Sequence, residues 1–204
     1  MTQANFVSFE GIDGCGKSTQ AKLLNQYFVD KGKDVIFSRE PGGSPGAEAI
    51  RGLLLTGNTD KWSAETELLL FTAARRDHLE TTIEPALASG KMVICDRFAD
   101  STRVYQGATR GDLRSKVDLL HTTMIGREPD ITIIIDVEPE VALKRGLARN
   151  SGEDRFEDFG LEFQENLRHG FLKLAEEYPF RCHLVDGNRP TEEVFKDVLV
   201  LAQP

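Results

Sequence analysis

The chain has 204 residues, of which 40% are hydrophobic and 28% are charged. These proportions are typical of a soluble globular protein and exclude a disordered chain. The formal net charge of −8 argues against a nucleic-acid partner, because proteins that bind nucleic acid normally carry a basic face.

Short apolar runs alternate along the chain with longer amphipathic ones. The short runs are apolar on consecutive positions, as expected of parallel strands that are covered on both faces. They predict strands over residues 6–9, 35–37, 92–95, 131–137 and 182–185. The amphipathic stretches predict helices over residues 18–31, 47–55, 65–89, 113–125, 139–150, 161–178 and 192–201. Thr191 is the N-cap candidate of the last helix.

Alternation of strands and helices predicts an α/β fold with right-handed crossovers. We expect one five-stranded parallel sheet with helices on both faces. No stretch is rich enough in Gly, Pro or Ser to mark a domain boundary. The sequence therefore predicts a single domain over residues 1–204.

The first strand runs into a glycine-rich segment, residues 11–18, that matches G-x-x-x-x-G-K-[ST] at every fixed position. The glycines let backbone N–H groups turn inward around phosphate oxygens, and the following helix adds the positive end of its dipole. We expect Lys17 to reach the β- and γ-phosphates of ATP and Ser18 to ligate Mg²⁺. The predicted ATP-binding residues are Gly11, Ile12, Asp13, Gly14, Cys15, Gly16, Lys17, Ser18 and Thr19.

Several arginines lie where a parallel sheet opens its cleft, beyond the carboxyl ends of the strands. Arg39 follows the second strand, Arg97 follows the third, and Arg75 and Arg76 lie on the long predicted helix. Phe71 is four residues before Arg75, so a ring and a guanidinium share one helix face and can contact a base together. Taken singly, each of these side chains also fits an ordinary surface or core position. Together they form a local cationic cluster that suits a phosphorylated small molecule.

Two aspartates end apolar strands, Asp96 after the third strand and Asp136 after the fourth. A carboxylate at this position beside a phosphate-binding loop commonly holds Mg²⁺ through the water shell of the ion. Arg97 follows Asp96, whereas no phosphate-binding residue follows Asp136. The predicted metal site therefore consists of Ser18 and Asp96.

Five segments resemble the thymidylate kinase family in their order and spacing. They are Phe9-Glu10-Gly11, Arg39-Glu40-Pro41-Gly42-Gly43, Phe71-Thr72-Ala73-Ala74-Arg75-Arg76, Asp96-Arg97-Phe98 and Tyr105-Gln106-Gly107. The resemblance extends from the first strand to the neighbourhood of Arg155, and more loosely to the C-terminus. It implies a P-loop kinase fold. It also implies an enzyme that converts thymidine monophosphate to the diphosphate with Mg-ATP, a step toward thymidine triphosphate.

The resemblance also implies roles for the residues that contact the acceptor. Phe71 would stack on thymine, and Arg75 would be its hydrogen-bond partner. The acceptor phosphate would be held by Arg39 and Arg97, with Arg51 close by.

Further roles concern the sugar. Asp13 would meet the 3′-hydroxyl of the deoxyribose. The segment that closes on base and sugar corresponds to Ser101, Thr102, Tyr105 and Gln106. Arg103 and Val104 are bulkier than the small residues expected there, so they are expected to alter the fine shape of the base pocket.

A lid is implied over residues 149–156, a polar segment that contains glycine. Arg149 and Arg155 would close over the β- and γ-phosphates, an arrangement typical of the bacterial branch of the family. The acceptor phosphate is already a nucleophile, so no strong general base is needed and rate comes from positioning and charge neutralisation. The predicted catalytic residues are Lys17, Asp96, Arg97, Arg149 and Arg155.

Two other functions stay open. Another P-loop kinase would act on a different nucleotide or on a deoxynucleoside, and a nucleoside acceptor would need a general base and fewer phosphate clamps than Arg39 and Arg97. A nucleotide-dependent switch belongs to a different class, but the guanine-reading string Asn-Lys-x-Asp of GTPases is absent from the sequence.

The expected cellular location is inferred from sequence patterns that are absent. No run approaches the ~18 apolar residues that span a bilayer, and the N-terminus has no signal-peptide pattern. Cys15, Cys95 and Cys182 are scattered, as in reduced cytoplasmic proteins. The histidines share no metal or catalytic spacing and are expected to be structural or surface residues. The family resemblance implies a homodimer packed through helices, for which the faces of residues 65–89 and 113–125 are candidates.

Overall fold

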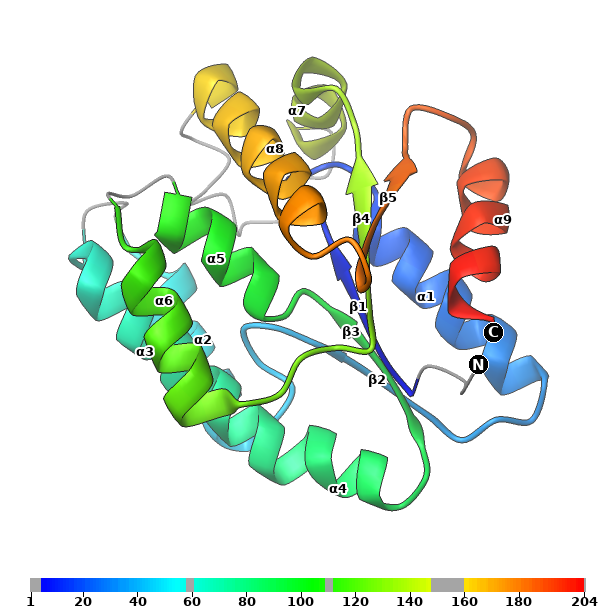
Figure 1. The fold of residues 1–204 in the computed structure, drawn as a ribbon, viewed down its shortest axis with the longest axis horizontal. Coiled ribbons are helices and arrows are strands. Elements are labelled where there is room, and N and C mark those ends of the chain that lie inside the picture. The colour runs from blue at the N-terminus through cyan, green and yellow to red at the C-terminus, as the bar shows by residue number, and fades with distance from the viewer. Residues whose placement is uncertain (1–4, 58–60, 109–111, 148–159, 204) are drawn as a thin grey trace.

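The computed structural model describes residues 5–57, 61–108, 112–147 and 160–203. Within these residues, one parallel sheet has the strand order β2-β3-β1-β4-β5. Helices α1 (Lys17–Asp30) and α9 (Thr191–Ala202) cover one face of the sheet, and α5 (Ala99–Ala108) and α8 (Gly160–Glu177) cover the other (Figure 1). The predicted α/β fold is confirmed.

All the predicted strands are present. Their bounds are β1 Phe6–Glu10, β2 Val35–Arg39, β3 Met92–Asp96, β4 Ile131–Asp136 and β5 Cys182–Asp186. The first strand occupies the centre of the sheet, with β3 and β4 on its two sides. Its loop therefore opens at the middle of the carboxyl edge, between the ends of two neighbouring strands.

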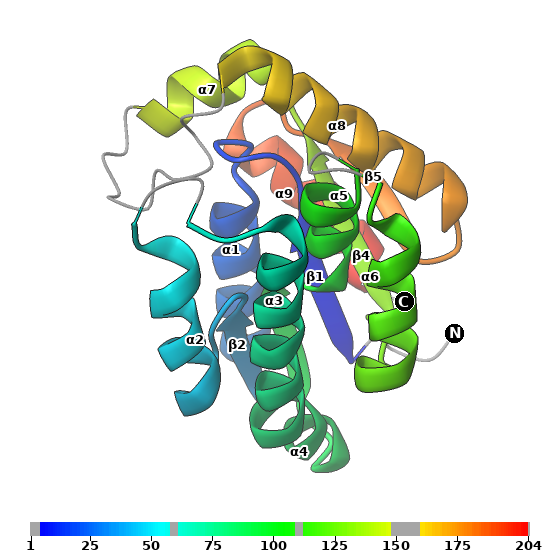
Figure 2. The same cartoon turned by 90° about the vertical axis from the view of Figure 1, so that its left-hand side faces the viewer.

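The remaining helices are α2 Pro45–Leu55, α3 Ala64–His78, the π-helical turn η1 Leu79–Ile83, α4 Glu84–Ala88, α6 Arg114–Leu120, the π-helical turn η2 His121–Ile125 and α7 Pro139–Leu147. Figure 2 shows these helices from the side: α7 lies near the loop after β1, and α4 lies at the opposite end of the molecule. Each of the predicted helices has a counterpart in this set or among α1, α8 and α9.

Three details of the helix prediction are wrong. The stretch of residues 65–89 is divided into α3, η1 and α4, because Pro85 lacks an N–H and its ring would collide with the carbonyl group of the preceding turn. Residues 113–125 likewise end in a π-helical turn, which Gly126 closes in the left-handed conformation. Thr191 is the first residue of α9, and the N-cap position belongs to Pro190 without a side-chain cap.

Helix α5 was missed altogether. Its buried side has polar side chains, among them Asp100, Thr102, Arg103 and Gln106, each at most 4% exposed. The apolar periodicity that identifies an amphipathic helix is therefore weak in this segment.

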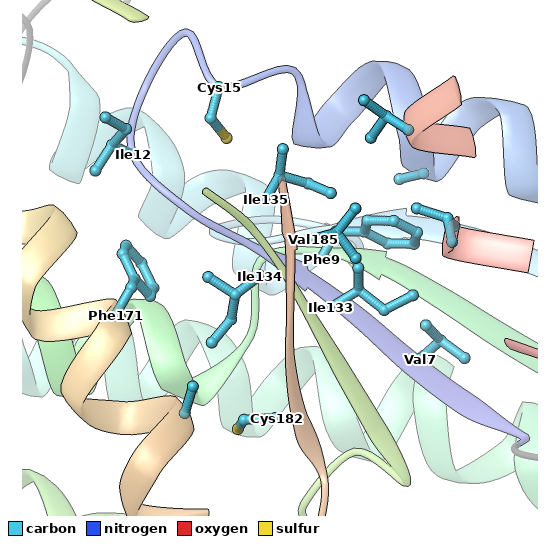
Figure 3. Packing of buried hydrophobic residues seen from close by; sticks show 14 of the residues in the cluster. Val7, Phe9, Ile12, Cys15, Ile133, Ile134, Ile135, Phe171, Cys182 and Val185 are labelled. Atoms are coloured by element: carbon cyan, nitrogen blue, oxygen red, sulfur yellow. The ribbon is translucent and has the colours of Figure 1, made fainter. Parts of the chain in front are cut away.

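The larger hydrophobic core lies between the sheet and helices α1, α8 and α9 (Figure 3). Ile12 and Cys15, from the loop after β1, are both 2% exposed and belong to this core. Burial of these two side chains anchors the loop to the sheet, so neither of them is available to a ligand.

Candidate active site

The loop between β1 and α1 requires glycine at two positions. Gly11 and Gly14 have φ angles of 132° and 81°. A Cβ atom would lie 2.6 Å from the Ile135 carbonyl oxygen at Gly11, and 2.0 Å from that of Ala142 at Gly14. The chain can therefore pass close to β4 and α7 only as glycine, and this path turns the main chain into a cradle.

Lys17 closes the open side of this cradle. Its Nζ atom donates to the Ile12 carbonyl oxygen at 3.2 Å and contacts Asp13 Oδ1 at 3.5 Å. The lysine is 6% exposed. It is thus held by the loop itself, with its charge at the mouth of the cradle.

A cleft of about 390 Å³ begins at this loop and extends toward α2, α3 and α5. Every residue that the sequence analysis assigned to the acceptor lines it: Asp13, Arg39, Arg51, Phe71, Arg75, Arg97, Ser101, Thr102, Tyr105 and Gln106. Gly14, Lys17, Ser18 and Asp96 line the same cleft. The two predicted halves of the site, one for phosphates and one for an acceptor, therefore form a single cavity.

Arg97 lies where the two halves meet. It has a φ angle of 72°, which is rare for a residue other than glycine and is concentrated at functional sites. Its guanidinium donates to Asp13 Oδ1, to Ser101 Oγ at 3.0 Å and to the Tyr105 hydroxyl at 3.2 Å. The strained backbone therefore aims a cation across the cleft toward the phosphate loop.

Asp13 accepts hydrogen bonds from both Tyr105 and Arg97. Tyr105 donates to its Oδ2 atom at 2.9 Å, and Arg97 pairs with Oδ1. Burial alone would raise the pKa of Asp13, but the charges of Arg97 and Lys17 outweigh it and lower the pKa well below its usual range. Asp13 is consequently a carboxylate, ready to accept a hydrogen bond.

Arg75 is fixed by a chain of buried polar groups. Its Nε atom donates to Glu40 Oε2 at 2.7 Å, and the other oxygen of Glu40 lies 3.1 Å from His78 Nδ1. His78 Nε2 contacts Ser38 Oγ at 2.6 Å. The Nη2 atom of Arg75 donates to Thr102 Oγ1 at 2.9 Å. The guanidinium therefore has a set orientation before any acceptor binds.

The remaining arginines are more loosely held. Arg39 is exposed and lies 3.4 Å from Glu48, and Arg51 donates to the Pro41 carbonyl oxygen at 2.5 Å. Arg76 lies outside the cleft lining, where its exposed side chain pairs with Glu80. Of the two adjacent arginines on α3, only Arg75 faces the cleft.

Asp96 and Asp136 differ in what surrounds them. Arg168 donates to both carboxylate oxygens of Asp136, at 2.7 and 2.9 Å. Asp96 lines the cleft, and its buried Oδ1 atom has no hydrogen-bond partner in the described residues. A buried oxygen without a partner is costly unless a ligand satisfies it. The donor set of Asp96 and Ser18, both hard oxygen ligands, fits a hydrated Mg²⁺ ion.

Three groups of predicted residues lie elsewhere. Arg149 and Arg155, the lid candidates, fall outside the described residues. Thr19 is exposed on the first turn of α1 and does not line the cleft. Arg103 and Val104 point away from the cleft, Arg103 into an ion-pair cluster and Val104 into the core, so the expected change of pocket shape does not occur.

Sequence reasoning assigned no role to several residues that build the site. Glu40, Pro41 and Phe98 line the cleft within quoted motifs, and so do Lys22, Phe37 and Leu55 from outside them. Glu10, at the end of β1, accepts from the Phe98 amide at 2.7 Å and from Ser101 Oγ at 2.5 Å, so it holds the turn that carries Arg97. A buried carboxylate directly before a phosphate loop was the signal that could have identified Glu10.

The chain is similar to known proteins over almost its whole length. The family model described as thymidylate kinase matches residues 9–198. A thymidylate kinase of Dinoroseobacter shibae is 68% identical over 200 residues, which are 98% of this chain and 97% of the relative. The chain belongs to the thymidylate kinase family. A second thymidylate kinase, from Caulobacter vibrioides, is 50% identical over 204 residues and covers 98% of each chain.

The fold agrees with this family. The crystal structure of thymidylate kinase from Ehrlichia chaffeensis superimposes with a TM-score of 0.79 at 36% identity, and the match covers 98% of both chains. The predicted family, the predicted P-loop kinase fold and the prediction of an enzyme are thus confirmed. No helix in the described part of this chain is long and apolar enough to cross a bilayer.

Proposed function

We propose that this kinase transfers the γ-phosphoryl group of ATP to thymidine monophosphate, with Mg²⁺, as a step toward thymidine triphosphate. The observation that carries the proposal is the single cleft, which has the phosphate cradle at one end and Phe71 and Arg75 at the other. Arg97 lies between them, within hydrogen-bonding distance of Asp13 and Ser101. A nucleoside acceptor without a phosphate would give Arg39, Arg51 and Arg97, which line this middle region, no phosphate to bind.

The residues of the chain would bind and orient the reactants. The main chain of the loop and Lys17 would hold the donor phosphates, and Arg39, Arg51 and Arg97 would hold the acceptor phosphate. An acceptor phosphate is itself a nucleophile, so alignment of the two phosphates and neutralisation of their charge supply most of the rate. Ser18 and Asp96 would hold a Mg²⁺ ion, which neutralises charge on the transferred group when bound.

A coupled ADP-release assay tests the proposal. The purified enzyme is supplied with ATP, Mg²⁺ and each nucleoside monophosphate in turn. Turnover should be highest with thymidine monophosphate, and omission of Mg²⁺ should abolish it. Activity confined to another monophosphate would contradict the acceptor assignment, and hydrolysis that no acceptor stimulates would support a nucleotide switch instead.

The role of Arg97 can be tested separately. Replacement Arg97→Ala should lower kcat/KM for thymidine monophosphate by about 100-fold or more, because a donor aimed at transferred charge is lost. ATP binding, measured by calorimetry, should survive. Arg127→Ala is the matched control, because Arg127 pairs with Glu84 outside the cleft. Undiminished turnover of the Arg97 variant would refute the assignment.

A homodimer that packs through α3 and α6 is part of the proposal. Leu69 on α3 and Leu119 on α6 are 57% and 62% exposed. They lie one turn after Glu65 and Lys116, which form an exposed ion pair at 3.2 Å between these two helices. Sedimentation velocity should show a dimer that Leu119→Glu converts to a monomer, and a monomeric parent protein would contradict it.

The remaining assignments are proposals of the same kind. All three cysteines are free thiols, which supports a cytoplasmic location. A single domain over residues 1–204, with a lid at about 149–156, agrees with the family match but its lid lies outside the described residues.

A further inference from the structure

The amide of Gln106 is held by a residue that does not line the cleft. Gln106 on α5 lines the cleft, and its Nε2 atom donates to Glu67 Oε1 at 2.9 Å. Glu67 lies on α3, has no exposed surface and contributes nothing to the cleft lining. The contact is therefore made behind the wall of the site.

The chemistry of this contact fixes which end of the amide faces the cleft. The Oε1 atom of Glu67 accepts the hydrogen bond, so the NH₂ group of Gln106 is the end that faces Glu67. The Oε1 atom of Gln106 then remains as the group that the side chain offers to the cleft. No described residue donates a hydrogen bond to Oε1. The orientation of a side-chain amide, usually ambiguous, is decided here by the identity of its partner.

Arg75 provides hydrogen-bond donors on the same wall of the cleft, where Gln106 provides an acceptor. A guanidinium has donors and no acceptor. Glu40 and Thr102 already occupy its Nε and Nη2 atoms, while its Nη1 atom has no partner among the described residues. Glu67, Phe71 and Arg75 follow one another at intervals of four along α3, so the ring lies between the two polar positions. The wall thus combines a flat apolar surface with one donor group and one acceptor group.

This combination matches one pyrimidine and mismatches another. Thymine presents the O4 acceptor next to the N3–H donor, whereas cytosine presents an amino donor next to the N3 acceptor. We propose that Glu67 is a positioning residue that makes the acceptor site select thymine over cytosine, by holding the Gln106 amide with its oxygen toward the base. This inference depends on the proposed function, because it presupposes a nucleoside monophosphate whose base contacts Phe71.

The variant Glu67→Gln tests the inference. A glutamine at 67 can both donate and accept, so the Gln106 amide is free to turn its NH₂ group toward a base. The kcat/KM for deoxycytidine monophosphate should rise about tenfold, the worth of one corrected hydrogen bond, while that for thymidine monophosphate changes less than about threefold. The gain should lie in KM for the acceptor, and KM for ATP should be unchanged.

Glu65→Gln is the matched control. It makes the same change two residues earlier on α3, where Glu65 is exposed and pairs with Lys116. Its preference between the two substrates should equal that of the parent enzyme. A gain of activity on a second substrate cannot result from damage to the fold, so the readout separates positioning from stability.

Exchanging the side chains at positions 67 and 106 should restore the preference for thymine. In the double variant Glu67→Gln, Gln106→Glu, the carboxylate faces the cleft as an acceptor and the amide behind it donates. The preference for thymine should return to that of the parent enzyme. This variant also decides the matter if Glu67→Gln alone does not fold, since a double variant without thymine preference overturns the inference.

Two further outcomes are informative. If the Glu67→Gln enzyme keeps the parent ratio of the two substrates, or loses both activities equally, the inference is wrong while the proposed function stands. If the parent enzyme itself does not act on thymidine monophosphate, the proposed function fails first, and the assay of that enzyme alone reveals it.

Discussion

Glu10 is a carboxyl group that has no exposed surface, and it holds the turn on which Arg97 lies. Burial, with the nearby charge of Asp100, raises its pKa from 4.5 to about 7. The folded protein therefore binds a proton at Glu10 below about pH 7, whereas the unfolded chain binds it only below about pH 4.5. Between these values the folded state holds more protons, so the free energy of unfolding falls as the pH rises.

Replacement Glu10→Gln should remove this pH dependence. Between pH 5 and pH 8 the parent protein should lose about 2.5 kcal/mol of unfolding free energy relative to the variant, as a pKa difference of this size requires. Denaturant unfolding of both proteins at several pH values measures the difference. Parallel curves for the two proteins would show that Glu10 titrates in its ordinary range.

At the scale of elements, the close packing of α5 against α8 depends on Gly170. A Cβ atom at this position would lie 2.8 Å from Val104 Cγ1. Gly170→Ala should destabilise the protein by about 1–3 kcal/mol through overpacking, despite the better helix propensity of alanine. Gly52→Ala on α2 meets no atom within 4 Å and should stabilise the protein by about 0.5–1 kcal/mol. Thermal unfolding of both variants measures the change in stability, which should be negative for Gly170→Ala and positive for Gly52→Ala.

Helices α5 and α8 show which elements can be predicted from the sequence and which cannot. The strands and α8 have regular apolar patterns, so they were predicted almost to their ends. Helix α5 buries Asp100 and Arg103 beside its apolar residues, and these charges are satisfied by each other and by Glu128 from outside the helix. The cleft residues were found through motifs. The contacts of Glu40 with Arg75 and of Glu67 with Gln106 were not predicted, because a contact between distant residues leaves no local pattern.

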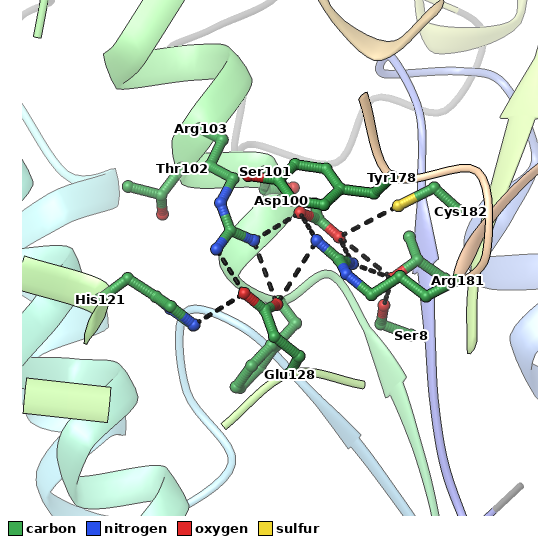
Figure 4. Close-up of polar contacts among 12 residues, drawn as sticks. Ser8, Asp100, Ser101, Thr102, Arg103, His121, Glu128, Tyr178, Arg181 and Cys182 are labelled. Atoms are coloured by element: carbon green, nitrogen blue, oxygen red, sulfur yellow. Dashed lines mark hydrogen bonds and ion pairs between the residues drawn. The ribbon is translucent and has the colours of Figure 1, made fainter. Parts of the chain in front are cut away.

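At the scale of the molecule, one ion cluster connects three separate parts of the chain. Asp100 of α5 accepts from Arg103 and Arg181, and Glu128, which precedes β4, pairs with both arginines (Figure 4). The Tyr178 ring lies under the Arg181 guanidinium at 4.7 Å. The cluster therefore ties α5, which lines the cleft, to the segments that directly precede β4 and β5.

Replacement Arg181→Met tests the importance of this cluster. It leaves Asp100, which is fully buried, without one of its charge partners, and should destabilise the protein by about 3–5 kcal/mol. The same change at Arg127, which pairs with Glu84 at a half-exposed site, should cost at most about 1 kcal/mol. Urea titration of the two variants provides the comparison, and equal losses would indicate that the buried cluster has no special weight.

The pairing of Asp13 with Arg97 means that the acceptor arrives at a cation which already has an anion. An incoming phosphate must compete with that carboxylate for the guanidinium. Asp13 would keep its contacts with Tyr105 and Lys17 after this displacement, and in the proposed function the sugar hydroxyl of a nucleotide would add a further donor, which inorganic phosphate lacks. Competition within the resting site would thus disfavour a free phosphate ion relative to a nucleotide, before the base is recognised.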